Sequence, residues 1–261
     1  METAKTNKPV FMLGDIVHNE QVVKQIQKAG IKKIYHLSEA RGKTLLIRAH
    51  GCSKNTLQKA KKLGYSVIDA TCPMVKDIHA IAKKLEGKGF KIIVIGDKSH
   101  DEVKGIVGQL KTKAIIIDKL KNIPLKRIKS IKKAGVIVQS TQNLDKAQEI
   151  FDILRKNIRK VEFHNTICKP TRTKQNEIKI MPLKNDVMII IGSKTSANTK
   201  RIYEISKSLN NKSYWVNSSG EINKNWVTGA KTIGITAGAS TPESSIQEVT
   251  QKIRNYIPKK L

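Results

Sequence analysis

The sequence predicts an α/β fold made of three similar small domains with parallel sheets. Short segments of β-branched and aliphatic residues alternate with longer amphipathic segments along the whole chain, an order typical of parallel strands joined by helices. A threonine, a cysteine and a proline stand together between a strand and a helix twice, at Cys72 and at Cys168, and each copy opens a block of similar strand–helix order. We therefore expect domains over residues 1–71, 72–165 and 166–261.

The first block contains two helical patterns and four strand patterns. Residues 20–29 are amphipathic, and a helix over residues 53–63 would have Ser53 or Cys52 near its N-cap. Short runs rich in β-branched residues are typical of buried strands. The strands are expected at residues 9–13, 33–36, 44–48 and 66–70.

The second block begins with Pro73, which suits the first turn of a helix because the N–H that it lacks has no partner there. Helices are expected at residues 73–85, 103–110 and 144–157. Strands are expected at residues 91–95, 114–117, 136–139 and 161–163. The pattern over residues 123–133 is ambiguous.

The third block, after Cys168, repeats the alternation of strands and helices. Its first helix begins at the turn that Cys168 occupies, and helices are also expected at residues 198–209 and 242–256. Ser240 or Thr241 would cap the last helix. Strands are expected at residues 187–191, 213–216 and 232–235.

Composition limits the class of protein. The 261 residues contain no apolar run that approaches a membrane span and no signal-peptide segment at the amino terminus. The chain has three widely spaced cysteines, an odd number that does not form a secreted disulfide framework. We expect a cytoplasmic protein that does not enter the membrane.

The formal charge of +29 makes a basic nucleic-acid-binding protein one alternative. The basic residues are mostly lysines spread along the whole length, however, and aromatic residues make up 4%, with no basic–aromatic interleaving of the base-stacking kind. We therefore interpret most of the charged residues as lying on solvated helix faces, and we expect no specific nucleic-acid partner. The remaining charge would attract an anionic small molecule such as a diphosphate.

The two cysteine turns carry the strongest chemical signal. A cysteine at the amino end of a helix meets the positive end of the helix dipole, which favours thiolate, the form that ligates metals or attacks electrophiles. The alternative is a pair of inert, half-buried thiols.

Polar residues also follow the expected strands, where ligands bind in parallel sheets. Residues 192–198 and 236–242 are rich in glycine, serine and threonine and lead into helices, as phosphate-binding turns do. Neither has the P-loop spacing, and each taken singly could be simple capping. Histidines and a carboxylate stand at equivalent ends, at His18, His50, His100 and Glu102.

These segments together resemble the 4-hydroxy-3-methylbut-2-enyl diphosphate reductase family, also called IspH or LytB. The matching motifs occur in family order across essentially the whole chain: Gly14-Asp15-Ile16-Val17-His18-Asn19, Arg48-Ala49-His50-Gly51, Asp69-Ala70-Thr71-Cys72-Pro73, His100-Asp101-Glu102-Val103, Gln139-Ser140-Thr141-Gln142, Thr166-Ile167-Cys168, residues 192–198 and residues 236–242.

The resemblance implies three domains around a central 4Fe–4S cluster, with one cysteine ligand from each domain and one iron left open for the substrate hydroxyl. It assigns Cys72 and Cys168 as cluster ligands. It makes Glu102 the proton source, with Ser140 or Thr141 passing that proton or orienting the alcohol and Thr171 in support. It assigns substrate binding to His18, His50, His100, Ser196, Ala197, Asn198 and Ser240, of which Ala197 stands where many members have a second serine. The other histidines, His36, His79 and His164, read as core or surface residues.

The implied activity is an iron–sulfur reductase of the non-mevalonate isoprenoid pathway. It converts an isoprenoid diphosphate, 4-hydroxy-3-methylbut-2-enyl diphosphate, to isopentenyl and dimethylallyl diphosphates by reductive dehydroxylation, with ferredoxin or flavodoxin as electron donor. The residue types agree, because a carboxyl group can protonate the leaving oxygen and a cluster can supply single electrons and a Lewis-acidic iron.

The chain departs from the family pattern at other places besides Ala197. Family members begin with a Gly-Phe-Cys-x-Gly-Val segment upstream of the position where this sequence starts, so we expect the first cluster cysteine and the first strand to be missing. Cys52, beside His50, is a possible substitute ligand, with a free buried thiol as its default reading. Pro182 is expected to interrupt a helix. A truncated, inactive homologue that retains only the diphosphate pocket is the second alternative.

Overall fold

The computed structural model describes residues 9–256. Within them, the strands form three sheets in which every neighbouring pair is parallel. The expected fold class, three small α/β domains with parallel sheets, is confirmed. The chain groups into two compact units, of which the first comprises Met1–Val17 and Val23–Ile167 and the second His18–Val22 and Cys168–Leu261. The domain boundaries expected from the sequence stay a prediction.

The first sheet lies in the first unit and has the strand order β2-β1-β3-β4. Its elements are β1 (Val10–Leu13), α2 (Glu20–Lys28), β2 (Ile31–Ile34), the 3-10 helix η1 (Leu37–Ala40), β3 (Thr44–Ile47), α3 (Lys54–Lys62) and β4 (Ser66–Asp69). Alternate residues of β1 face different hydrophobic clusters: Val10 and Met12 pack with α2, whereas Phe11 and Leu13 join the cluster that contains α3.

Strand β2 begins earlier than the sequence pattern indicates. Gly30 has a φ of 93°, which L residues with side chains rarely adopt, and it turns the chain from α2 directly into the sheet. Ile31 and Ile34 are then buried at the two ends of the strand, and Tyr35, inside the expected range of residues 33–36, is exposed.

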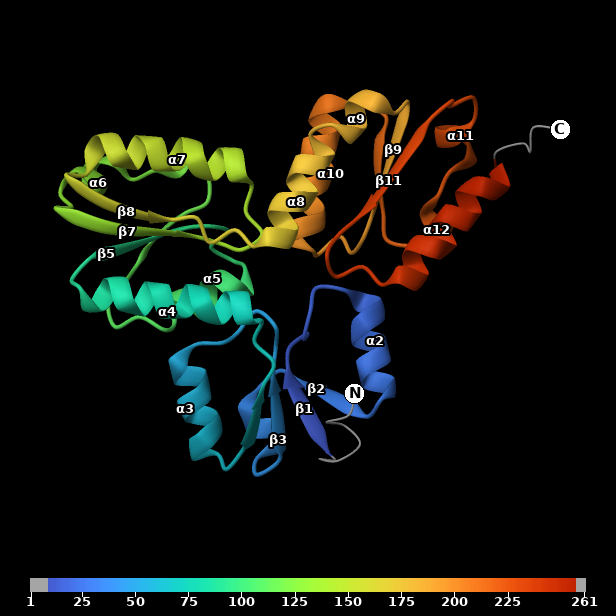
Figure 1. Cartoon of the computed structure of the whole chain (residues 1–261). Helices are drawn as coiled ribbons and strands as arrows, with labels where there is room; N and C mark the ends of the chain where they lie inside the picture. The colour runs from blue at the N-terminus through green and yellow to red at the C-terminus, as the bar shows by residue number, and fades with distance from the viewer. Residues whose placement is uncertain (1–8, 257–261) are drawn as a thin grey trace. The chain divides into compact units, whose positions relative to one another are not determined.

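The second sheet also lies in the first unit, with the order β6-β5-β7-β8. Figure 1 shows α4 and α5 on one face and α6 and α7 on the other. The elements are α4 (Pro73–Gly87), β5 (Lys91–Ile95), α5 (Asp101–Val107), β6 (Ile115–Ile117), η2 (Leu120–Asn122), α6 (Leu125–Lys129), β7 (Lys133–Val138), α7 (Leu144–Asn157) and β8 (Lys160–His164). The ambiguous segment at residues 123–133 thus contains a short helix, whose Ile128 is fully buried.

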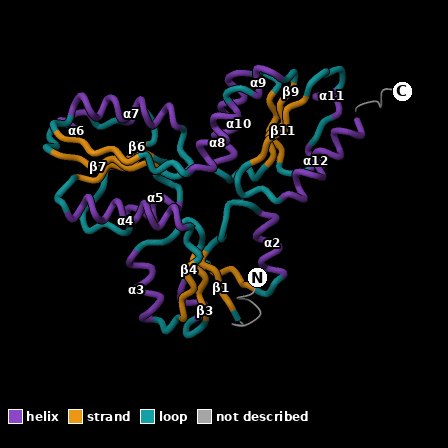
Figure 2. The backbone as a smooth tube through the Cα atoms, in the orientation of Figure 1, coloured by secondary structure: helices purple, strands orange, loops and turns teal. Residues whose placement is uncertain are grey.

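The third sheet makes up the core of the second unit, with the order β10-β9-β11. Figure 2 shows its three strands flanked by helices. The elements are α8 (Lys169–Ile178), α9 (Met181–Lys184), β9 (Val187–Ile191), α10 (Ala197–Leu209), β10 (Ser213–Val216), η3 (Ser219–Glu221), α11 (Lys224–Val227), β11 (Ile233–Ala237) and α12 (Glu243–Tyr256). The expected interruption at Pro182 is observed, because α8 ends at Ile178 and Pro182 lies in the first turn of α9.

All three sheets share one strand order, in which the first strand lies between the second and the third. The winding of the chain therefore reverses between β1 and β3, between β5 and β7, and between β9 and β11. A crevice opens beyond the carboxyl ends of two such strands, and this is where open parallel sheets bind ligands. We therefore expect functional residues at the carboxyl-end edge of each sheet.

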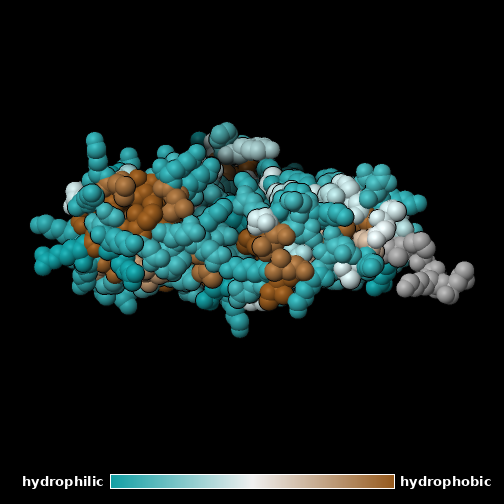
Figure 3. Space-filling view, turned by 90° about the horizontal axis from the view of Figure 1, so that it is seen from above, coloured by the Kyte–Doolittle hydropathy of each residue, from teal (hydrophilic) through white to brown (hydrophobic). Residues whose placement is uncertain are grey.

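Hydrophilic residues cover most of the face drawn in Figure 3, and hydrophobic residues gather there in separate patches. Large exposed apolar side chains include Ile180 and Leu183. None of the helices described in the structure is long and apolar enough to cross a membrane.

Core packing in the second sheet gives the first prediction. Leu154 of α7 is fully buried, so Leu154→Ala should lower the free energy of unfolding by about 2–5 kcal/mol through lost burial and a residual cavity. Leu183→Ala is the matched control, because Leu183 is 68% exposed and its loss should change stability by less than about 0.5 kcal/mol. Urea unfolding followed by circular dichroism measures both, and equal losses would contradict the packing described.

Candidate functional site

The candidate residues lie beyond the carboxyl ends of the strands. Loops after the reversal strands of the first unit carry His50 (after β3), His100 (after β5), and Ser140 and Thr141 (after β7). In the second unit, the loop after β9 carries Ser196, the helix α10 that follows begins with Ala197 and Asn198, and the loop after β11 carries Ser240. The cysteines Cys72 and Cys168 follow the last strands of their sheets, β4 and β8. His18 follows β1 and is grouped with the second unit.

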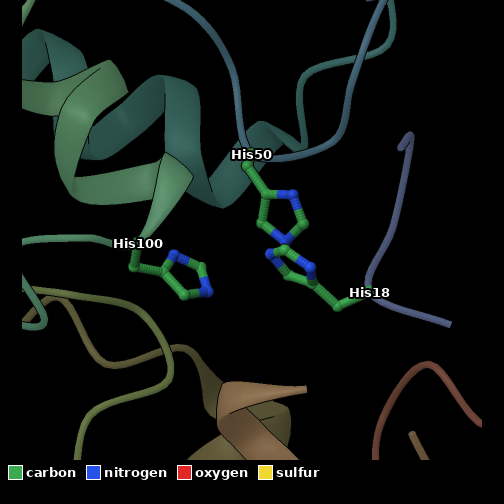
Figure 4. A group of neighbouring side chains, drawn as sticks. All are labelled: His18, His50 and His100. Atoms are coloured by element: carbon green, nitrogen blue, oxygen red, sulfur yellow. The ribbon is translucent and has the colours of Figure 1, made fainter. Parts of the chain in front are cut away.

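The structure brings His50 and His100 together. Their ring centroids lie 5.3 Å apart, with the rings nearly perpendicular at 84°. Figure 4 shows both side chains, with His18, and shows His100 at the start of a helix. His100 is the N-cap of α5, where its Nδ1 accepts a hydrogen bond from the Glu102 N–H at 3.2 Å. The neutral His100 ring therefore carries its proton on Nε2.

Glu102 is a buried carboxyl group held by one neighbour. The residue is 1% exposed, its Oε1 accepts the Ser140 N–H, and its Oε2 accepts the Ser140 hydroxyl, both at 2.6 Å. Burial raises the pKa of Glu102, while the hydrogen bonds from Ser140 oppose the rise. A carboxyl with a raised pKa is suited to hold a proton and to give it to a substrate.

The loop that carries His50 has little room to move. Gly51 has a φ of 72°, and a Cβ there would lie 2.8 Å from Cε1 of His79. A Cβ on Gly105 of α5 would lie 3.1 Å from the His50 carbonyl oxygen. Gly51 is therefore required by its φ and by this close approach to His79, whereas a side chain on Gly105 would push the His50 carbonyl by a few tenths of an ångström. The same loop is tied to the first cysteine turn, because the Cys72 N–H donates to the Ala49 carbonyl at 3.0 Å.

The remaining histidines lie outside this group. His79 is buried under the His50 loop, and burial lowers its pKa to about 4. His36 is exposed, and His164 approaches Glu162 at 4.0 Å near the end of β8.

Cys72 and Cys168 occupy equivalent positions. Each is the N-cap of a helix, α4 and α8 respectively, each is half-buried, and neither thiol caps a backbone N–H. The Cys168 sulfur lies 3.1 Å from the Thr171 hydroxyl, which in turn donates to Asn198 Oδ1 at 3.4 Å. A thiol at a helix amino end that the helix does not use is suited to bind a metal.

Cys52 differs from the other two cysteines. Its side chain packs against the hydrophobic cluster between the first sheet and α3. Burial, followed by the Asp69 charge, raises the pKa of its thiol to about 11. A thiol that stays protonated at neutral pH is a poor metal ligand, so the structure favours the free buried thiol over a substitute ligand.

Two glycine-containing turns of the second unit converge on one helix start. Ser196 is the N-cap of α10 and accepts the Thr199 N–H at 3.3 Å. A Cβ on Gly192 or on Gly238 would lie 2.7 or 2.0 Å from the Thr199 hydroxyl, so both turns approach α10 closely. Asn198 is buried, and its Nδ2 has no hydrogen-bond partner among residues 9–256. Helix N–H groups and an amide arranged in this way are suited to bind an anion.

Glu20 and Gln21, which the sequence analysis did not single out, connect the start of α2 to the Ser193 turn and to α12. Within the second unit, the Ser193 hydroxyl donates to Glu20 Oε1 at 2.7 Å, and the Ser245 hydroxyl donates to Gln21. Glu20 and Gln21 directly follow the His18-Asn19 motif, and this was the one feature of the sequence that could have pointed to them.

The chain is similar to one family throughout. A family model described as LytB protein matches residues 1–254. The 4-hydroxy-3-methylbut-2-enyl diphosphate reductase of Geobacter metallireducens is 35% identical over 254 residues, which cover 97% of this chain and 89% of that protein. The enzyme of the same name from Aquifex aeolicus is 36% identical over 250 residues, with 94% and 85% covered.

Two solved structures are also similar. The first is described as (E)-4-hydroxy-3-methyl-but-2-enyl diphosphate reductase, the terminal enzyme of the non-mevalonate pathway, with a TM-score of 0.70, 36% identity, and 97% of this chain and 91% of that chain covered. The second is the E-1-hydroxy-2-methyl-but-2-enyl-4-diphosphate reductase from Plasmodium falciparum, with a TM-score of 0.87, 28% identity, and 96% and 80% covered.

Burial of His79 predicts a pH dependence of stability. In the unfolded chain the imidazole gains a proton below about pH 6.5, whereas the folded protein resists this until a pKa of about 4. The stability present above pH 6.5 should therefore fall as the pH drops toward 4, by up to about 3 kcal/mol from this residue. Urea unfolding at several pH values should show a shallower loss for His79→Gln than for the parent, and an unchanged slope for His164→Gln. Identical slopes in all three proteins would show that His79 does not resist protonation.

Proposed function

Because the chain belongs to the LytB family, we propose that it reduces 4-hydroxy-3-methylbut-2-enyl diphosphate to isopentenyl and dimethylallyl diphosphates. The resemblance inferred from the motifs is thereby confirmed. The observation that carries the proposal is the buried Glu102 carboxyl, hydrogen-bonded to Ser140 and two residues after His100 in the sequence. Neither alternative, a nucleic-acid-binding protein or an inactive homologue, is favoured by the similarity to these reductases.

The reaction replaces an allylic hydroxyl by hydrogen. The substrate gains two electrons and two protons, its C–O bond breaks, a new C–H bond forms, and the oxygen leaves as water. Glu102 would give a proton to the leaving oxygen, and the raised pKa of the carboxyl suits that role. Ser140 bonds directly to Glu102, so it would pass the proton or orient the substrate alcohol. Thr141 would share the orienting role.

We assign diphosphate-binding groups to each unit by itself. In the first unit, His50 and His100 would contribute ring N–H groups. His18, which follows the reversal strand β1, would contribute its ring in the second unit. In the second unit, the buried amide of Asn198 and the hydroxyls of Ser196 and Ser240 would donate to phosphate oxygens. Ala197 has no hydroxyl to give, and its contribution is a backbone N–H in the first turn of α10.

The cysteine turns fit the family's 4Fe–4S cluster in part. Cys72 and Cys168 would act as thiolate ligands, because each thiol stands half-buried at a helix amino end and caps no backbone N–H. The buried and protonated Cys52 does not fit. When bound, such a cluster supplies electrons one at a time and a Lewis-acidic iron for the hydroxyl.

An electron donor is required because two electrons enter the reaction. We propose a ferredoxin or a flavodoxin in this role. The net charge of +29 would favour association with an acidic carrier protein. Free thiols as cluster ligands suit a reducing compartment, which supports the cytoplasm as the site of action.

Replacing the proton source tests the assignment of Glu102. Glu102→Gln keeps the size of the side chain but removes the transferable proton, so turnover should fall by about 10²–10⁴-fold while the Kd for the substrate changes little. Glu177→Gln is the control, since Glu177 pairs with Lys174 on the exposed face of α8. Reduction of the diphosphate substrate under anaerobic conditions gives turnover, and calorimetry gives the Kd. Unchanged turnover would remove Glu102 from this role.

Iron content separates the three cysteines. After anaerobic reconstitution, Cys72→Ala and Cys168→Ala should each lose most of the bound iron and of the visible cluster absorbance, since each removes a thiolate ligand. Cys52→Ala should keep the iron of the parent. Loss of iron on changing Cys52, with retention on changing Cys72 or Cys168, would reverse the ligand assignment.

A further inference from the structure

We propose that Arg48 and Asp101 form a positioning pair that holds the His50 loop and the His100–Glu102 turn in register. The inference rests on the proposed function, because it assigns a purpose to the spacing of these three side chains. Neither Arg48 nor Asp101 would touch the substrate.

The pair joins two sheets at the edge where the histidines lie. Arg48 directly follows β3 and precedes His50 by two residues, and Asp101 opens α5 between His100 and Glu102. The Arg48 Nη1 atom lies 2.6 Å from Asp101 Oδ2. The two side chains are 22% and 24% exposed, so the contact is shielded from water on most sides and is stronger than an exposed ion pair.

The surroundings leave Arg48 room for this contact and few substitutes for it. A Cβ on Gly14, the residue after β1, would lie 3.2 Å from Arg48 Nη1, so the missing side chain there admits the guanidinium. Lys104 is the other cation near Asp101, but its Nζ is 3.7 Å from Oδ1 and its side chain is 61% exposed. A flexible, solvated lysine cannot hold the carboxylate in one place as Arg48 does.

Other contacts fix the far end of α5. The Lys54 N–H donates to the Gly108 carbonyl at 3.0 Å, and the Gln109 side chain donates to the Cys52 carbonyl at 2.7 Å. These hydrogen bonds attach the carboxyl end of α5 to the start of α3. Without the Arg48–Asp101 pair, the helix would stay attached there, but its first turn would lose its charged anchor to the His50 loop.

The consequence for the site is geometric. His100 is the N-cap of α5, and Glu102 lies in its first turn, so a pivot of that turn moves both side chains relative to His50. A displacement of about 1 Å at a reacting group can cost about 10²-fold in rate. The 5.3 Å spacing of the two rings is therefore the quantity that the pair would set.

A double-mutant cycle tests the pair with full-length protein. Arg48→Ala and Asp101→Ala should each lower kcat/KM by about tenfold or more, and the double variant should be no worse than the poorer single variant, because residues that act as a unit are not additive. Arg48→Lys should recover part of the loss, since one donor atom makes the contact. Arg155→Ala, which removes an arginine paired with Asp152 on the exposed face of α7, should behave like the parent.

Hydrogen exchange supplies a readout that does not need turnover. In Arg48→Ala, the amides of Glu102 and Val103 should exchange at least about tenfold faster than in the parent, whereas those of the β5 and β7 strands should not change. A variant that merely fails to fold would show faster exchange in the strands too. An unchanged rate in the first turn of α5, or additive kinetic effects, would overturn the proposal.

The two readouts also separate this inference from the proposed function. If the parent protein reduces no substrate, the proposed function fails, and binding of inorganic pyrophosphate replaces kcat/KM in the cycle. Coupled losses of pyrophosphate affinity with faster exchange in α5 would then support the pair. Faster exchange with unchanged affinity would show that the contact is structural and would overturn the positioning role.

Discussion

The shared strand order is the constraint on which the site depends. Each sheet places its first strand between the second and the third, so each has one reversal at which loops diverge and leave polar groups accessible. His50 and His100, the buried carboxyl of Glu102 with its serine partner, and the hydroxyl-rich turns of the second unit all follow reversal strands. Cys72 and Cys168 follow the outermost strand of a four-stranded sheet instead, whereas Cys52 follows the reversal strand β3. The topology thus separates the two proposed cluster ligands from the proposed anion-binding groups.

Close packing around these residues determines their pKa values and their freedom to move. The pKa of Glu102 is raised because α5 seats the carboxyl in the interior, and the hydrogen bonds from Ser140 oppose the rise. The His50 loop passes so near α4 and α5 that a Cβ on Gly51 would press on His79 and a Cβ on Gly105 would press on the His50 carbonyl. Burial in these surroundings raises the pKa of the Glu102 carboxyl and lowers the pKa of the His79 imidazole.

Much of the fold could be predicted from local patterns, because alternating strands and helices leave a periodic signal and prolines and glycines mark their ends. The carboxyl-end placement of His50, His100 and the serine-rich turns followed from that signal. The start of β2 did not, because pairing with β1 and burial of Ile31 outweigh the local pattern. The Arg48–Asp101 contact was also beyond the sequence, since it joins residues 53 positions apart whose proximity depends on two sheets meeting.

The burial of Cys52 gives this chain a built-in distinction among its three thiols. Because the pKa of Cys52 is about 11, about one molecule in a thousand would carry the nucleophilic thiolate there at pH 8. Cys72 and Cys168 stand at the amino ends of α4 and α8 and do not belong to the hydrophobic cluster that covers Cys52. Oxidants and alkylating agents should therefore modify Cys72 and Cys168 before Cys52. Chemical damage to the protein would then begin at the two proposed cluster ligands.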